Sequence, residues 1–383
     1  MGSGYAGVGV DVRKRGIEGF RRITNNIFRD AFCPVVRDPS SKSRCTVLHT
    51  DGAGSKPVQS YLRWRETGEK GCFEGLAQDV VAMNVDDIIC VGAVPVGFVD
   101  YIAVNPIVVP KALVLKELCD GFRRCFALLR KYGLSVSFAG GETADLPDQL
   151  RTLDVSGTVS GTVRLSEAVT GTRIAPGDLI VGLRSGGRAR YEKKENSGIM
   201  CNGITLARHC LMLAEYGRKY PEILEPGSKP YYGRFRHDDR VDRLYMTVGD
   251  AILSPTRIFA PAVLEMLRVA GGDITGMVHN TGGGQTKCLR LGRNIRYVKD
   301  EPIDPDPIFI LIRDEAKLSW REMYEDFNMG TGFEVIVRKK SADRVLDVAE
   351  RFGIGAKVIG RCEREKGGNS LVIAGPGGKI VYR

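Results

Sequence analysis

Glycine-rich turns that follow short apolar runs are the features of this sequence that could carry chemistry. The apolar run at 45–50 ends in Asp-Gly-Ala-Gly-Ser-Lys at 51–56, and another run leads into Gly-Gly-Glu-Thr at 140–143. A third turn, Thr-Gly-Gly-Gly at 281–284, follows His279. Glycine lets main-chain N–H groups approach phosphate oxygens, and carboxylate oxygens hold magnesium. Each turn alone is more often just a tight turn.

A helix with buried carboxylates accompanies these turns. Apolar residues recur at helical spacing from Phe73 to Ile89, which predicts a buried helix face. Asp79 and Asp86 are seven residues apart, so they project within about 20° of one another, with Asp87 roughly 100° further around. The alternative is a solvated helix face. Combined with the turns, the cluster favours a magnesium nucleotide site.

The chain is long enough for two domains to position these residues. Its 383 residues exceed one ordinary core, and the turn-rich stretch 165–176 predicts a linker. We therefore expect an N-terminal nucleotide-binding and dimerisation domain at 1–168 and a C-terminal domain at 175–383. In the first domain, the patterns predict a strand at 45–50, a helix at 110–131, and strands at 134–139 and 153–163.

The second domain is expected to be α+β. Residues 217–248 are rich in Pro, Gly, Tyr, Arg and Asp without periodicity, which indicates a surface excursion. A helix at 257–270 is expected, capped by Ser254 or Thr256, and a strand then leads to His279. Further elements are expected as a strand at 179–183 and a βαβ-like unit at 333–338, 342–352 and 356–360.

Composition excludes several classes of protein. No apolar run of about 18 residues occurs, and the first 20 residues lack a signal-peptide core, so we expect a cytoplasmic protein without a membrane partner. The ten cysteines form no CxxC pair and are expected to be buried thiols. The net charge of +10 suits either nucleic acid or phosphorylated substrates. The basic run 184–194 has one aromatic, Tyr191, which favours a mobile loop over a base-stacking surface and no nucleic-acid partner.

The ordered motifs resemble those of the aminoimidazole ribonucleotide (AIR) synthetases, the phosphoribosylformylglycinamidine cyclo-ligases. Eight segments match in order across both expected domains. They are GVGVD at 7–11, HTDGAGSK at 49–56, QDVVAMNVDD at 78–87, GGETAD at 140–145, Asn202-Gly203, SPTR at 254–257, HNTGGG at 279–284 and FNMG at 327–330.

The resemblance implies a two-domain α+β fold with a C-terminal α/β sandwich. The N-terminal sheet would form a barrel at the interface of a homodimer, with ATP near that interface. It implies Mg²⁺ as a cofactor and leaves a K⁺ requirement open. The implied metal ligands are Asp51 and Asp87, and the implied nucleotide-binding residues are Asp79, Gly140, Gly141, Glu142 and Thr143.

The implied reaction is ATP-dependent closure of formylglycinamidine ribonucleotide to AIR, with ADP and phosphate, in purine biosynthesis. ATP would activate the formamide oxygen as a leaving group, and the amidine nitrogen would then attack. The implied catalytic residues are Lys56, at phosphate, and His279. The implied substrate-binding residues are Gly54, Ser55, Asn202, Gly203, Gly282, Gly283 and Asn328. A surface lysine and a histidine that merely caps a strand are the alternatives.

The sequence departs from the shorter bacterial members of the family. Where they carry a Gly-Gly-Phe-rich stretch, residues 31–44 read AFCPVVRDPSSKSR, and the segment 186–203 is enlarged. We hypothesise that this segment folds over a nucleotide or substrate phosphate and that Lys193 and Lys194 contribute. Selenophosphate synthetase and small-molecule kinases of the same superfamily are the alternatives, because they also use ATP. A nucleic-acid-binding protein without catalytic activity is a further alternative.

Overall fold

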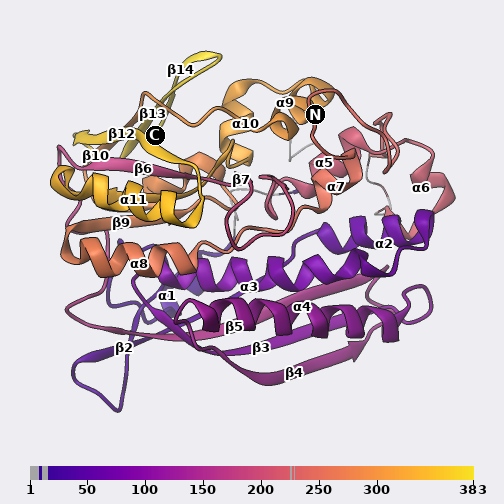
Figure 1. The fold of residues 1–383 in the computed structure, drawn as a ribbon, viewed down its shortest axis with the longest axis horizontal. Helices are drawn as coiled ribbons and strands as arrows, with labels where there is room; N and C mark the ends of the chain where they lie inside the picture. The colour runs from indigo at the N-terminus through magenta and orange to yellow at the C-terminus, as the bar shows by residue number, and fades with distance from the viewer. Residues whose placement is uncertain (1–7, 11–15, 225–226, 228) are drawn as a thin grey trace.

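The computed structural model describes residues 8–10, 16–224, 227 and 229–383. Gly7 and Asp11 of the first matching motif lie outside these residues. The described part has two α+β units, each built on its own sheet (Figure 1). Among the described residues, no helix combines the length and apolarity needed to cross a bilayer.

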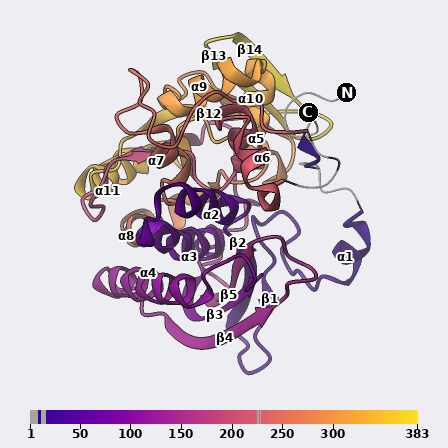
Figure 2. The same ribbon diagram turned by 90° about the vertical axis from the view of Figure 1, so that its right-hand side faces the viewer.

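The first unit is an open five-stranded sheet in the order β1-β2-β5-β3-β4. Helices α3 and α4 lie on one face of it, and no described helix covers the other face (Figures 1 and 2). The strands are β1 (Val36–Arg37), β2 (Arg44–Gly52), β3 (Val94–Val104), β4 (Ser137–Asp145) and β5 (Leu153–Arg164). The helices are α1 (Glu18–Ile23), α2 (Lys56–Thr67), η2 (Lys70–Phe73), α3 (Glu74–Ile89) and α4 (Lys111–Lys131).

The second unit is a seven-stranded sheet in the order β14-β13-β10-β12-β6-β11-β9. Its strands are β6 (Leu179–Arg184), β9 (Ile274–His279), β10 (Ile295–Lys299), β11 (Thr331–Val337), β12 (Ala356–Arg364), β13 (Ser370–Gly375) and β14 (Gly378–Tyr382). The helices are α5 (Ile204–Leu211), α6 (Tyr216–Lys219), η3 (Pro221–Ile223), α7 (Val248–Leu253), α8 (Ala260–Ala270), η4 (Gly271–Asp273), η5 (Gly284–Arg290), α9 (Pro307–Ala316), α10 (Trp320–Asp326), η6 (Lys339–Ser341) and α11 (Ala342–Phe352).

Helix α3 joins the two units. Every residue from Asp79 to Ile89 is buried, which fits a helix enclosed on all sides rather than one with a single buried face. On one side α3 packs on β2 and β5, and on the other it contacts α8 of the second unit. The predicted burial of this helix is therefore confirmed, and the alternative of a solvated carboxylate face is wrong.

Most expected elements are confirmed, including the mixed α+β class and the βαβ-like unit. Strands β11 and β12 flank β6, each antiparallel to it, so α11 connects two strands that are parallel to one another. The excursion at 217–248 contains α6, η3 and isolated bridges before α7 begins. The enlarged segment forms a narrow hairpin, because β7 (Gly186–Gly187) pairs with β8 (Asn196–Ser197).

The expected turn at 140–143 is wrong. These residues continue β4, which pairs in parallel with β3 through Asp100↔Gly141 and Tyr101↔Glu142. The pairing register between β3 and β4 shifts between Phe98 and Asp100. Next to this shift Gly140 has φ +96°, a backbone conformation that residues with a side chain rarely adopt. A Cβ at Gly141 would collide with the Asp100 carboxylate. The glycines therefore serve a bulged strand and a close side-chain approach rather than a turn.

Two smaller expectations also fail. Helix α8 begins at Ala260 and makes no hydrogen bond to a capping side chain of its own segment. Instead, the Asp86 carboxylate of α3 accepts hydrogen bonds from the amides of Phe259 (2.9 Å) and Ala260 (2.8 Å). Asp86 thus supplies the acceptor that Ser254 or Thr256 was expected to provide.

The expectation that all ten cysteines are buried is also not met. Cys119 is exposed because it lies on the outer side of α4, and Cys72 is half-buried.

Candidate functional site

Two histidines from different units meet one carboxylate at the C-terminal end of α3. His279, the last residue of β9, places Nδ1 2.7 Å from Asp87 Oδ1. His49 of β2 places Nε2 3.2 Å from Asp87 Oδ2. The other ring nitrogen of His49 lies 3.2 Å from Asn84 Oδ1, one helical turn before Asp87. Both carboxylate oxygens of Asp87 are therefore engaged across the boundary between the units.

A divalent cation fits one side of this cluster. His49, Asp51 and Asp87 each offer a ligand atom, and these atoms lie within 4.8 Å of one another. Two of the three are carboxylate oxygens, the donors that Mg²⁺ prefers. Asp51 Oδ1 accepts from the Gly52 amide at 2.8 Å, which fixes the side chain at the strand end. The predicted ligands Asp51 and Asp87 are thus neighbours. His49 is a third candidate ligand, which was not predicted from the sequence.

Electrostatics set the charge state of the cluster. Burial by itself would raise the pKa of Asp87, but the charge of Lys287 and the hydrogen bonds to His279 and His49 hold that pKa well below its usual value. Burial lowers the pKa of His279, although Asp87 opposes the shift. Asp87 is therefore ionised and His279 is neutral near pH 7. A neutral imidazole beside an anionic acceptor carries its proton on the nitrogen that faces that acceptor.

Lys287 is the cation of this site. It lies in η5, directly after the turn 281–284, and is 8% exposed. Its Nζ donates to the carbonyl of His279 at 3.1 Å and to Thr281 Oγ1. Lys287 was not among the residues predicted from the sequence, although its place three residues after a triple glycine was the available signal.

The structure brings most of the predicted substrate-binding residues together. A Cβ at Gly54 would lie 3.2 Å from the Cys201 carbonyl, and a Cβ at Gly282 would lie 3.4 Å from Asn202 Oδ1. Ser55 Oγ is 2.8 Å from Thr205 Oγ1, so the turn after β2 meets the start of α5. Gly203 and Gly283 adopt positive φ at neighbouring helix starts.

Asn328 contacts the enlarged hairpin and the helix that follows the glycine turn. Its Oδ1 accepts from Ser185 Oγ at 2.9 Å, and its amide donates to the Gly198 carbonyl. Gln285 Nε2 donates to the Asn328 carbonyl at 2.6 Å, which connects Asn328 to the helix that carries Lys287. Asn328 thus links the enlarged hairpin to the glycine turn.

Lys56 and Asp79 form a buried pair away from the histidines. Lys56 Nζ lies 2.7 Å from Asp79 Oδ1 and 2.8 Å from the Ser254 carbonyl, and both side chains are 0–1% exposed. The same Asp79 oxygen accepts from the amide and hydroxyl of Thr256, each at 2.7 Å. In this structure the pair connects α2 and α3 to the second unit. Its predicted contact with a nucleotide stays a prediction.

Residues 140–143 are not at the cluster within one chain. Across the sheet, Asp51 pairs with Gly157, Gly157 with Asp100, and Asp100 with Gly141. Three strand spacings of about 4.8 Å put the two ends of this row roughly 14 Å apart. Gly141 and Thr143 instead line a groove of about 640 Å³ beside α4. Glu142 pairs with Tyr101, whose side chain lies on the uncovered face of the sheet.

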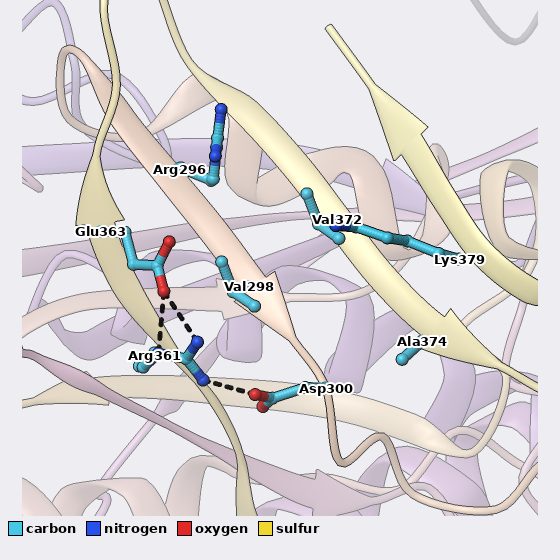
Figure 3. A pocket seen from close by; sticks show the side chains of 8 residues that line it. All are labelled: Arg296, Val298, Asp300, Arg361, Glu363, Val372, Ala374 and Lys379. Atoms are coloured by element: carbon cyan, nitrogen blue, oxygen red, sulfur yellow. Dashed lines mark hydrogen bonds and ion pairs between the residues drawn. The ribbon is translucent and has the colours of Figure 1, made fainter.

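Two other hollows share no lining residue with the cluster. Lys193 and Lys194 line a cleft of about 620 Å³ with Arg63 and Arg124, between the enlarged hairpin and the start of α3. A smaller pocket of about 320 Å³ lies over β10, β12, β13 and β14 (Figure 3). There Arg361 forms ion pairs with Asp300 and Glu363, so much of its charge is neutralised locally. The structure does not bring Lys193 and Lys194 to the Asp87 cluster.

Family models match both units of the chain. Residues 31–163 match the AIR synthase related protein, N-terminal domain, and residues 175–373 match the AIR synthase related protein, C-terminal domain. The phosphoribosylformylglycinamidine cyclo-ligase of Methanococcus vannielii is 37% identical over 320 residues, covering 83% of this chain and 77% of that protein. The protein of the same name from Methanocaldococcus jannaschii is 36% identical, covering 88% and 83%.

Solved structures share the fold at low identity. Phosphoribosylformylglycinamidine synthase II from Thermotoga maritima gives a TM-score of 0.55 at 13% identity, covering 96% of this chain and 48% of that one. This chain therefore spans about half the length of that synthase. A chain of the HypE–HypF complex gives a TM-score of 0.55 at 12% identity, covering 96% and 98%.

Proposed function

The chain belongs to the AIR synthase related family, and on this premise we propose that it is a phosphoribosylformylglycinamidine cyclo-ligase. It would use ATP to close formylglycinamidine ribonucleotide to AIR, releasing ADP and phosphate, in cytoplasmic purine biosynthesis. The observation that carries the proposal is the Asp87 carboxylate held between His49 and His279, at the junction of both family domains. Domain limits of 1–168 and 175–383 are part of the same proposal.

His279 would act as a base in ring closure. Its Nδ1 donates to Asp87, so Nε2 carries the lone pair. Nε2 is buried and has no hydrogen-bond partner among the described residues. A neutral imidazole with one free acceptor nitrogen suits removal of the proton from the attacking amidine nitrogen. Asp87 then stabilises the imidazolium that forms.

Asp51 and Asp87, with His49, would hold Mg²⁺ beside the nucleotide. Bound there, the ion would neutralise phosphate charge during phosphoryl transfer. The group formed by Gly54, Ser55, Asn202 and Gly282 would orient the ribonucleotide, since these residues lie close together. Lys56 and Asp79 would contribute by fixing the position of the turn 51–56 against the second unit.

A homodimer would complete the nucleotide site. The uncovered face of the first sheet carries exposed apolar side chains, including Leu48 (60% exposed), Val96 and Tyr101. Among the residues that the structure describes, both sheet edges are open, because β4 ends the order on one side and the two-residue β1 covers only the start of β2 on the other. Two copies joined through these surfaces would close the sheets into a barrel. Gly140, Gly141, Glu142 and Thr143 of one copy would then reach the ATP of the other.

Selenophosphate chemistry finds no support in the thiols. Cys33 lies beside the cluster, but it is 4% exposed and its Sγ donates to the Asp87 carbonyl. Burial raises the pKa of this thiol. A reactive cysteine needs an accessible, stabilised thiolate, and Cys33 has the opposite surroundings.

The test is to incubate the protein with ATP, Mg²⁺ and formylglycinamidine ribonucleotide. We expect AIR, ADP and phosphate in equal amounts. Asp87→Asn should abolish the reaction, and the exposed Asp347→Asn on α11 should leave it unchanged. ATP hydrolysis at the same rate without the ribonucleotide, with no AIR formed, would contradict the cyclo-ligase assignment.

A further inference from the structure

Lys287 is buried and keeps one hydrogen-bond donor without a protein acceptor among the described residues. An ammonium has three N–H donors, and within the described part of the chain Lys287 uses two, on the His279 carbonyl and Thr281 Oγ1. The Phe32 ring lies 4.9 Å from Nζ and limits the directions that the side chain can take. A lysine needed only to cap the end of β9 would require neither burial nor this aromatic contact.

The turn that precedes Lys287 offers further donors. In the described residues, the amides of Gly282 and Gly283 donate to no protein acceptor, whereas the next amide, Gly284, donates to the Thr281 carbonyl. Gly283 has φ +93°, so the chain turns sharply between these amides and the lysine. Free amides beside an ammonium are the donor set that recognises a phosphate oxygen.

The other predicted phosphate-binding lysine is already engaged. Lys56 is fully buried and bonds to Asp79 and the Ser254 carbonyl. Lys287, in contrast, is the cation whose charge acts on both Asp51 and Asp87. It therefore lies near the residues suited to hold a divalent cation.

We propose that Lys287, with the amides of Gly282 and Gly283, binds the phosphoryl group that passes from ATP to the formyl oxygen. This inference rests on the proposed cyclo-ligase function. The bond between the γ-phosphorus and the bridging oxygen of ADP breaks as the bond to the formyl oxygen forms. On ring closure the amidine nitrogen bonds to the formyl carbon and passes its proton to His279, the carbon–oxygen bond breaks, and inorganic phosphate leaves from Lys287. In this role Lys287 supplies positive charge rather than a proton; burial lowers the pKa of its ammonium, and the nearby Asp87 and Asp51 oppose that shift.

Inorganic phosphate is the probe that separates this role from a structural one. We expect Lys287→Met to lower kcat by about 100-fold and to raise the inhibition constant of phosphate by about 10-fold. The inhibition constant of ADP should change less than about 3-fold, because Lys287 would contact only the transferred group. Lys287→Arg should recover part of the phosphate inhibition, and the exposed Lys366→Met is the matched control.

A variant that fails to fold can be told apart from one that fails to bind phosphate, and both can be told apart from a failure of the proposed cyclo-ligase function. If Lys287→Met does not fold, Lys287→Gln keeps a donor for Thr281 without the charge and is expected to show the same loss of phosphate binding. If the wild-type protein makes no AIR, calorimetric titration of phosphate into the wild-type and variant proteins still tests the site. Equal phosphate affinity in a folded, uncharged variant, or a loss of kcat that only follows a loss of thermal stability, would overturn the proposal.

Discussion

The imidazole of His279 and the carboxylate of Asp87 are joined at 2.7 Å although they are 192 residues apart and belong to different domains. Asp87 lies in the last turn of α3, which is buried from Asp79 onward, and His279 ends a strand of the second sheet. The contact fixes the tautomer of His279 and at the same time holds the two domains in register. The proposed catalytic base and the packing between the domains therefore share one hydrogen bond.

His279→Gln should lower kcat by at least about 100-fold with little change in thermal stability, because glutamine can bond to Asp87 but cannot accept a proton. Glutamine is preferred to alanine because the ring is fully buried beside Phe259 and Phe333, where truncation would leave a cavity. Steady-state kinetics and thermal melts check this prediction, with His237→Gln as the control. Parallel losses of activity and stability would favour a purely structural histidine.

Asp86→Ala should destabilise the protein by about 2 kcal/mol, since it leaves the amides of Phe259 and Ala260 buried without an acceptor. Asp86→Asn should cost less because the amide oxygen can still accept one of the bonds. Urea unfolding measures the free energy of unfolding, with Asp347→Ala on the surface of α11 as the control. Equal stability of the Ala variant and wild type would show that the start of α8 does not need this acceptor.

Lys56→Met should cost about 3 kcal/mol of unfolding free energy, because it leaves the Asp79 carboxylate buried without its counter-charge. Adding Asp79→Asn should recover more than half of that loss, since the amide oxygen can still accept from Thr256. A double-mutant cycle in urea measures the coupling. Simple addition of the two single effects would contradict a coupled pair, and full activity of the double variant would remove Lys56 from the catalytic assignment.

Stability should fall as the pH is lowered from about 6.5 toward 4, in part because of His237. Burial and the charge of Arg63 lower the pKa of His237 to about 4, against about 6.5 in the unfolded chain. Between these values the unfolded state binds a proton that the folded state excludes, so acid favours unfolding by up to about 1.4 kcal/mol per pH unit. His237→Gln should flatten this slope in urea titrations at several pH values. An unchanged slope would show that His237 does not control it.

Leu48→Arg should weaken the proposed dimer by at least about 10-fold, because it places a charge on the apolar uncovered face of the first sheet. Tyr245→Arg changes another exposed apolar residue, 87% exposed and far from that sheet in sequence, and should have no effect. Sedimentation equilibrium measures the dimer dissociation constant. A monomeric wild-type protein with full cyclo-ligase activity would contradict the barrel arrangement.

Local patterns in the sequence were enough to predict much of the fold. Helix α4 and strands β2, β5, β6 and β9 follow directly from apolar periodicity, because each exposes one face and buries the other or is buried throughout. The glycines at 140–141 were wrongly predicted to form a turn, because glycine occurs in a bulge within a strand as readily as in a turn. The cap of α8 could not be predicted, because its acceptor lies 173 residues away.

The sequence by itself determined the family, through ordered motifs. It also identified Asp51 and Asp87 as candidate metal ligands and His279 as a candidate catalytic residue. Only the tertiary structure decided how they combine, because hydrogen-bond direction, burial and charge depend on neighbours distant in the chain. It joined Asp87 to both His49 and His279, enclosed Lys56 in an ion pair, and placed Lys287 beside the carboxylates. Spacing specifies which side chains share an element, whereas packing between domains decides which of them meet.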